Sequence, residues 1–239
     1  MDGIQNPTRL NTPSVHHTSK PWTWLYKPAG LPVFPPHADP NGDCVLAWMR
    51  TILPAQAEEF PKGFEGGIAH RLDVSTSGLI VVAQDPNSLH ALRQSFSRGL
   101  LIKKYLFVSN REVPWSEHHV TTPIAHHKTQ KRAMTVKRGK NTPHRGKWYP
   151  ADTRFRRIKG PLWEAIITTG VTHQIRVHAA SVGISLRGDR LYGGGQLNHA
   201  DAPPNIQFQL HHTEIQGPVE NLPSLACPPL LPPDWWGLQ

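Results

Sequence analysis

Three short polar segments of the sequence carry side chains that could take part in a reaction. The first, residues 70–78, reads HRLDVSTSG and runs directly into the apolar stretch 78–84. A polar group beside buried structure costs free energy unless it is used or paired, and reactive groups are often presented on such loops. Asp73 is therefore a candidate catalytic carboxylate. The serines and threonine around it also fit a plain turn, in which Asp73 only closes its own backbone.

The second segment, residues 172–178, reads THQIRVH and places four long polar side chains on one short expected helix. Gln174 and His178 lie four residues apart and share one face of that helix, whereas His173 and Arg176 lie three apart and share another. The segment could hold a substrate. It could equally be an amphipathic helix with a solvated side.

The third segment places a phenol, Tyr105, after Lys103 and Lys104 in an otherwise apolar stretch. A phenol offers both an aromatic face and a hydroxyl that can move a proton. Taken alone, such a tyrosine is more often a core aromatic with a satisfied hydroxyl.

The elements that must position these side chains are short strands and helices in mixed order. Alternating or continuous apolar residues predict the strands, and apolar residues at helical spacing predict the helices. Asp43, Asp85 and Thr172 are the expected helix caps. No regular βαβ rhythm connects the elements, which favours an α+β fold. The expected strands are 22–26, 78–84, 103–108, 162–169 and 206–211, and the expected helices are 45–52, 86–99 and 172–183.

The positive charge of the chain is concentrated in one stretch. The net charge is +9, and residues 128–159 contain twelve Lys and Arg against the single acid Asp152. Glycines and prolines interrupt this stretch and predict a loop or an irregular hairpin. Trp148, Tyr149 and Phe155 lie among its cations, a composition that suits a nucleic acid whose bases can stack on aromatic rings. A solvated lysine-rich loop is the alternative.

Composition disfavours several classes of protein. Hydrophobic residues make up 38% of the 239 residues, enough for a conventional core. No apolar run approaches the length of a membrane span, and residues 1–20 lack the apolar core of a secretory signal. Cys44 and Cys227 have no CxxC partner, so we expect a cytoplasmic protein. The adjacent histidine pairs lack the HExxH spacing, which disfavours a metal-dependent hydrolase and predicts no metal site.

Several segments together resemble a known family. HRLDVSTSGLIVVA, KKYLFV and GVTHQIRVHAASVGISLRGDRLYGG, in this order, are similar to the signature segments of the RluA-type pseudouridine synthases, which isomerise uridine in ribosomal or transfer RNA. YKPAGLPVFPP and FQLHHTEI extend the resemblance over about residues 22–236. The resemblance implies a mixed, largely antiparallel central sheet flanked by helices. It also implies an isomerase that uses no cofactor.

The resemblance assigns roles to single residues. It implies that Asp73 is the catalytic aspartate, that Tyr105 lies against the uracil and that Arg176 pairs with the aspartate. An isolated carboxylate in a dry pocket would take up a proton, and a guanidinium beside it would keep it ionised. Arg71 matches the arginine associated with holding the RNA open where the base leaves the stack. Val171 departs from the family, which usually has an arginine there.

The expected partner is a loop or bulge of ribosomal or transfer RNA, whose bases are already partly unstacked. A uridine must flip out of the stack to reach a pocket carboxylate. A non-catalytic RNA-binding module on the same fold is the alternative function. The candidate RNA contacts are His70, Arg71, Thr76, Lys104, Lys131, Arg132, Lys137, Arg138, His173 and Gln174.

The sequence predicts a simple domain organisation. Residues 1–20 are polar and aperiodic, and we expect a flexible arm there. Residues 21–239 are expected to form a single catalytic domain with a basic insertion around 126–160. The arm is too short for the separate RNA-binding domain that many family members carry ahead of the catalytic one. A monomer is expected.

Overall fold

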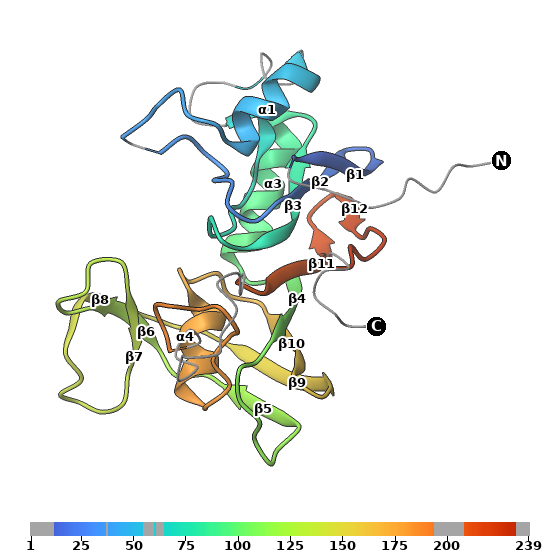
Figure 1. Cartoon of the computed structure of the whole chain (residues 1–239). Coiled ribbons are helices and arrows are strands. Elements are labelled where there is room, and N and C mark those ends of the chain that lie inside the picture. The colour runs from blue at the N-terminus through green and yellow to red at the C-terminus, as the bar shows by residue number, and fades with distance from the viewer. Residues whose placement is uncertain (1–11, 37, 55–59, 61–64, 194–207, 233–239) are drawn as a thin grey trace. The chain divides into compact units, whose positions relative to one another are not determined.

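The structure is a computed structural model that describes residues 12–36, 38–54, 60, 65–193 and 208–232 (Figure 1). Its contacts group into two compact units. Unit 1 comprises Met1–Arg98 and His211–Gln239, and unit 2 comprises Gly99–Leu210. Each unit has its own strands and its own buried apolar residues. The assignment of residues 21–239 to a single catalytic domain stays a prediction.

Unit 1 is built on a mixed sheet of strands β1 (Ser14–Ser19), β2 (Trp22–Lys27), β3 (Ser77–Ala83), β11 (Leu210–Val219) and β12 (Leu222–Leu225). Strand β2 pairs antiparallel with both β1 and β3, and β12 pairs antiparallel with β11. Strands β3 and β11 run parallel, with Ser77 opposite His211. Every residue of β2 and β3 is buried. The sheet is therefore covered on both faces at its centre.

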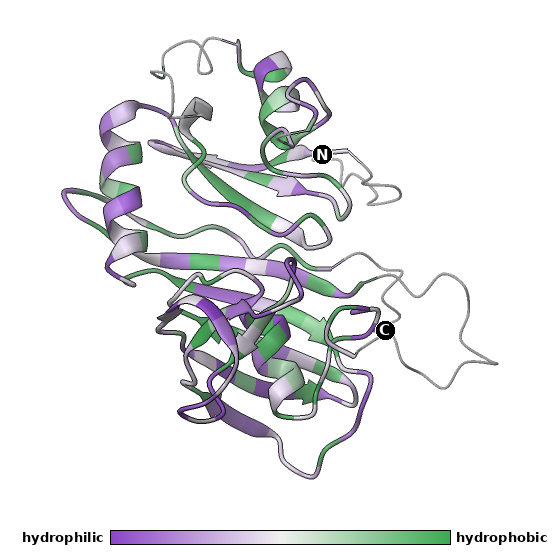
Figure 2. Ribbon diagram, turned by 90° about the vertical axis from the view of Figure 1, so that its left-hand side faces the viewer, coloured by the Kyte–Doolittle hydropathy of each residue, from purple (hydrophilic) through white to green (hydrophobic). Residues whose placement is uncertain are grey.

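The described part of unit 1 also contains helices and a 3₁₀ turn, η1 (Glu65–Gly67). Helix α3 (Pro86–Ser97) contacts β3 and presents polar and apolar stripes (Figure 2). Oδ1 of Asp85 accepts a hydrogen bond from the amide of Ser88 at 2.9 Å, so the predicted cap is confirmed. Helix α1 (Val45–Ile52) has the expected bounds, but its cap is Cys44 and not Asp43, because Sγ of Cys44 accepts the amide of Ala47.

The prediction of a flexible arm over residues 1–20 is wrong for part of that range. Residues 14–19 form strand β1, held by antiparallel pairing to the buried strand β2. The polar side chains of β1 are largely exposed, which explains why its sequence lacks the apolar signal of a strand. Residues 1–11 of the expected arm lie outside the described residues.

Unit 2 contains an antiparallel sheet in the order β4 (Ile102–Val108), β10 (Leu162–Ile167), β9 (Thr153–Lys159) and β5 (Glu117–Val120). One face of this sheet is apolar because alternate residues of β4, β9 and β10 are buried. Phe107, Phe155 and Trp163 are its largest buried side chains. The rings of Phe107 and Phe155 meet edge to face at 5.8 Å.

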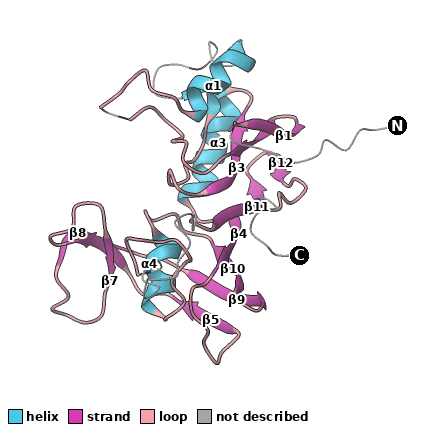
Figure 3. Cartoon of the chain, in the orientation of Figure 1, coloured by secondary structure: helices cyan, strands magenta, loops and turns pink. Residues whose placement is uncertain are grey.

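Helix α4 (Gln174–Ser181) and a second, three-stranded sheet also belong to unit 2 (Figure 3). The second sheet has the order β7 (Met134–Val136), β6 (Ile124–His127) and β8 (His144–Tyr149), all antiparallel. We call residues 124–149, its strands and loops, the basic sheet. Its apolar side chains pack against helix α4. The small core formed there consists of Ile124, Met134, Val136, Ala151 and Val177.

These elements confirm the α+β class with a mixed, largely antiparallel sheet flanked by helices. The basic stretch 128–159, expected to be a loop or an irregular hairpin, contains strands β7 and β8, which both pair with β6, and strand β9, which pairs with β10 and β5 in the larger sheet. None of the helices in the described part of the chain is long and apolar enough to cross a membrane.

Glycine at position 78 is required by the pairing of β3 with β11. Its φ is +122°, and a Cβ there would lie 2.3 Å from the carbonyl oxygen of His212. We expect Gly78→Ala to lower the free energy of unfolding by about 2 kcal/mol or more, measured by thermal and urea denaturation. Gly139→Ala is the control, because nothing lies within 4 Å of its added Cβ. A Gly78→Ala protein as stable as the control would contradict this reading.

Candidate active site

The segment that carries Asp73 is a tight turn fastened to a neighbouring loop. The carbonyl oxygen of Asp73 accepts the amide of Thr76 at 3.0 Å, which closes the turn. The carbonyl oxygen of Val74 accepts the amide of Gly30 at 2.8 Å. It also accepts a hydrogen bond from Nζ of Lys27 at 3.1 Å. The half-buried Asp73 side chain is thus presented by a fixed backbone.

Lys27 is the charged group beneath this turn, and the sequence reasoning did not select it. Its side chain is fully buried, and Nζ also donates to the carbonyl oxygens of Pro28 at 2.9 Å and Leu31 at 2.7 Å. Burial lowers the pKa of Lys27 to about 7, while attraction to the Asp73 carboxylate acts in the opposite direction. The sequence feature that could have pointed to Lys27 is its place at the end of an apolar strand, directly before Pro-Ala-Gly.

The other candidate residues of this segment differ in exposure. Arg71 is exposed and accessible to a large ligand. Thr76 is buried. Nε2 of His70 accepts the amide of Val81 at 3.0 Å, and the His70 ring lies 5.0 Å from that of Phe96. His70 and Thr76 are therefore both part of the packed structure around the Asp73 turn.

Tyr105 lies in the middle of β4 on the buried face of its sheet. Lys103 and Tyr105 share that face, whereas Lys104 is on the opposite, partly exposed face. Nζ of Lys103 donates to the carbonyl oxygen of Thr169 at 2.8 Å, in the loop before helix α4. Burial lowers the pKa of Lys103 to about 8. Tyr105 and the Lys103 ammonium group thus lie on the same buried face of the sheet.

Arg176 is held by a second acid that the sequence reasoning also missed. Its Nε donates to Oδ2 of Asp189 at 2.8 Å, and its Nη2 donates to Oδ1 at 2.9 Å. Both side chains are almost fully buried. The guanidinium lies 5.2 Å from the ring centre of Tyr192 and 5.0 Å from that of Phe208. The signal for Asp189 was the segment GDRLYGG that follows the helix.

Asp73 belongs to unit 1, and Tyr105 and Arg176 belong to unit 2. The expected pair between Asp73 and Arg176 therefore stays a prediction. Within its unit, each of the three side chains is carried by backbone that buried hydrogen bonds hold in place. Fixed supports of this kind are what a catalytic group needs.

The start of helix α4 differs from the expectation. His173, not Thr172, is the capping residue, and it adopts the left-handed conformation with φ of 55°. The side-chain amide of Gln174 is buried. Its Oε1 accepts hydrogen bonds from Oγ1 of Thr169 and from the backbone amide of Val171, and its Nε2 donates to the carbonyl oxygen of Asp152 and to Oγ1 of Thr153. Gln174 therefore fastens the loop before the helix.

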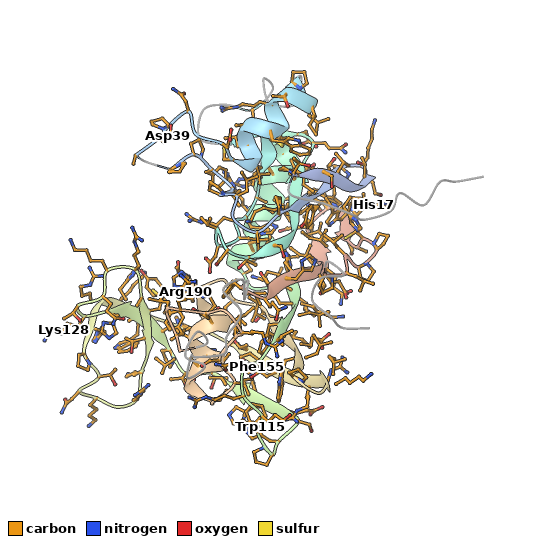
Figure 4. The ribbon with its side chains drawn as sticks, in the orientation of Figure 1. His17, Asp39, Trp115, Lys128, Phe155 and Arg190 are labelled. Atoms are coloured by element: carbon orange, nitrogen blue, oxygen red, sulfur yellow. The ribbon has the colours of Figure 1, made fainter. Side chains whose placement is uncertain are left out.

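The basic sheet carries the remaining candidate RNA contacts. Lys131 and Arg132 precede β7 and Lys137 and Arg138 follow it, and all four are exposed. Residues 124–149 contain eight Lys and Arg and no acid. Lys128 lies at the outer end of this sheet, away from the rest of unit 2 (Figure 4). The sheet thus presents a uniformly cationic surface.

The aromatic residues of the basic stretch divide between surface and core. Trp148 is partly exposed, and its ring lies 4.4 Å from that of His144. Phe155 is buried in the larger sheet, so its ring is not available to a base. The expectation that Phe155 contributes to an aromatic binding surface is therefore wrong. It fails because Phe155 takes an inward position in the alternation of β9.

Histidine, cysteine and carboxylate side chains do not gather into a metal-binding group of three anywhere in the described ranges. Cys44 and Cys227 form no disulfide bond.

Comparison with protein families and curated proteins finds consistent relatives. The family described as RNA pseudouridylate synthase matches residues 22–181. Ribosomal large subunit pseudouridine synthase D of Zymomonas mobilis is 33% identical over 191 residues, which are 77% of this chain and 56% of the relative. An uncharacterized RNA pseudouridine synthase of Bacillus subtilis is 32% identical over 216 residues, 84% of this chain and 65% of the relative. The chain thus spans less than two thirds of the length of these relatives.

Solved structures share the fold. Human RNA pseudouridylate synthase domain containing 1 superimposes with a TM-score of 0.69 over 93% of this chain and 86% of that chain, at 21% identity. Human RNA pseudouridylate synthase domain containing 4 gives a TM-score of 0.67 over 90% of this chain and 88% of that chain, at 22% identity.

The Lys27 ammonium group is expected to be required for the stability of the Asp73 turn. Lys27→Met keeps the length of the side chain but removes one hydrogen bond from each of three carbonyl oxygens, of which that of Val74 keeps a second donor, the amide of Gly30. This loss should lower the free energy of unfolding by about 1–3 kcal/mol. Urea denaturation measures the loss. Lys159→Met is the matched control, because Lys159 is exposed at the end of β9. Equal stability of the two variants would show that Nζ does not hold the turn.

Proposed function

We propose that this chain, which belongs to the RNA pseudouridylate synthase family, converts uridine to pseudouridine in RNA. One observation carries the proposal. The family match includes Asp73, Tyr105 and Arg176, and each of them stands on a rigid, hydrogen-bonded support in its unit. The remaining steps follow from the chemistry of the reaction.

The isomerisation breaks the bond between uracil N1 and ribose C1′, turns the base and forms a bond between C5 and C1′. The hydrogen at C5 leaves, and N1 gains one. No net oxidation occurs, so the reaction itself requires no redox cofactor. We assign to Asp73 the carboxylate that starts the reaction, as a nucleophile or a base. Arg176 would keep this carboxylate ionised and oriented.

Tyr105 would serve the detached uracil in two ways. Its ring offers a flat apolar surface on which the base can turn, and its hydroxyl can take part in proton transfer. Strand β4 places it on the same buried face as Lys103. This support keeps the phenol in one orientation while the base moves.

The basic sheet would hold the RNA while the nucleotide flips out. Flipping costs a few kcal/mol, and phosphate contacts from its lysines and arginines can offset that cost. Arg71, exposed beside the Asp73 turn, is the proposed group that holds the RNA open. The substrate is a loop or bulge, with ribosomal RNA favoured over transfer RNA by the name of the relative from Zymomonas mobilis.

We also propose that the protein is a monomer and that it works in the cytoplasm. Two cysteines that form no disulfide bond suit the cytoplasm.

Replacement of the catalytic carboxylate separates this function from its alternative, a non-catalytic RNA-binding module. With RNA labelled by tritium at uracil C5, we expect wild-type protein to release tritium. Asp73→Asn should lower the release rate by at least about 100-fold while RNA affinity is kept. Binding without release from any RNA would favour the alternative. Release unchanged by Asp73→Asn would remove the catalytic role of Asp73.

RNA affinity should fall steeply with salt, because each phosphate contact releases counterions. The slope of log affinity against log salt should decrease by about 0.7–0.9 for each contact removed. We expect this decrease when Lys131, Arg132, Lys137 and Arg138 are changed to Glu, measured by filter binding or fluorescence anisotropy. Lys20→Glu with Arg50→Glu is the control, because both residues are exposed on unit 1. An equal effect of both sets would place the RNA elsewhere.

A further inference from the structure

One hydroxyl in unit 2 joins the basic sheet to the segments that hold Arg176. The hydroxyl oxygen of Tyr192 accepts the backbone amide of Met134 at 2.8 Å. The same oxygen lies 2.9 Å from Nδ1 of His173. Met134 is the first residue of β7, and His173 is the residue from which helix α4 starts. A single side-chain atom therefore touches both elements.

The backbone of Tyr192 is fixed by the acid that holds Arg176. Oδ1 of Asp189 accepts the amides of Leu191 at 3.1 Å and Tyr192 at 3.3 Å. The same oxygen accepts Nη2 of Arg176 at 2.9 Å. The Tyr192 ring lies 5.2 Å from the guanidinium carbon. A displacement of Tyr192 therefore acts on Arg176 through both the carboxylate and the ring.

Strand β7 is where RNA would act on this network. Lys131 and Arg132 lie just before the strand, and Lys137 and Arg138 lie just after it. Strand β7 is the edge of its sheet and pairs with β6 alone among the described strands. The Tyr192 hydroxyl accepts the outward-facing amide of Met134, the first residue of that edge strand. An RNA backbone held at both ends of β7 would therefore fix the strand against Tyr192.

The conformation of His173 depends on the groups around it, among which is the Tyr192 hydroxyl. A left-handed conformation is unfavourable for a residue with a Cβ and persists only where surrounding structure imposes it. His173 has φ of 55° and no side-chain capping bond to its own helix. Its imidazole is instead directed to Tyr192. The helix that carries Arg176 thus starts from a residue tied to the basic sheet through one hydroxyl.

We propose that Tyr192 is a positioning residue that aligns Arg176 when RNA engages the basic sheet. The inference rests on the proposed function. In this proposal, part of the free energy of the remote phosphate contacts is used to align a catalytic group. Binding energy used in this way raises kcat and does not simply lower KM. Tyr192 itself would not touch the reacting base.

Tyr192→Phe tests the proposal, because it removes the hydroxyl and keeps the ring beside Arg176 and the small core. We expect kcat for tritium release to fall about tenfold, with RNA affinity within about threefold of wild type. Thr135→Val is the matched control. It removes a hydroxyl from the neighbouring residue of β7, whose bond to the Val136 carbonyl is long, at 3.5 Å. A merely structural role would lower thermal stability and RNA affinity together, and this result would overturn the proposal.

A double-mutant cycle tests the coupling itself. Arg132→Ala should lower kcat in the wild-type background and have little further effect on kcat in the Tyr192→Phe background. Additive effects on kcat would overturn the proposal. Full activity of Tyr192→Phe would do the same while leaving the proposed function intact.

A measurement that needs no turnover distinguishes the coupling through Tyr192 from the proposed function. The ¹⁵N-labelled Nε signal of Arg176, assigned with Arg176→Lys, should shift when an RNA stem-loop is added to wild-type protein. The shift should be lost in Tyr192→Phe and kept in Thr135→Val. This pattern in a wild-type protein that releases no tritium would support the coupling and refute the proposed function. An equal shift in wild type and Tyr192→Phe would refute the coupling.

Discussion

The buried ion pair of Arg176 with Asp189 organises the part of unit 2 that joins helix α4 to the loop after it. Taking two charges out of water is costly, and the attraction between them compensates only when the geometry is good and the other polar atoms are also bonded. Here both guanidinium contacts are short, and the carboxylate also accepts two backbone amides. The loop after helix α4 is therefore folded around Asp189. The guanidinium is thus tied, through one carboxylate, to the backbone of Leu191 and Tyr192.

A buried cation also organises unit 1. The Lys27 ammonium group donates to three carbonyl oxygens from two loops, so it joins the Pro28 loop to the Asp73 turn. In both units a buried cation thus holds backbone that carries, or lies beside, a candidate catalytic group. A rigid support of this kind is the general requirement for a site that must hold its geometry during a reaction.

The sequence predicted those features that depend on local patterns. Apolar runs located β2, β3, β4 and β10, and the Asp85 cap located helix α3. It failed where contacts between distant segments decide. Strand β1 is polar and exists because β2 offers it a partner. Phe155 is placed by the alternation of β9. Lys27 and Asp189 gain their roles from burial and from partners that no local spacing reveals, while Asp73, Tyr105 and Arg176 were selected through family resemblance.

The order of the two units along the chain has a consequence for how the protein folds. Unit 2 is one continuous segment, whereas unit 1 is assembled from both ends of the chain. The hydrogen bond between Ser77 and His211 spans 134 residues, and closing so long a loop in an unfolded chain carries a large entropic cost. If unit 2 forms first from its nearer contacts, that loop is already shortened. During synthesis on the ribosome, strand β3 must therefore wait for β11 to emerge, with its parallel edge unpaired in the meantime.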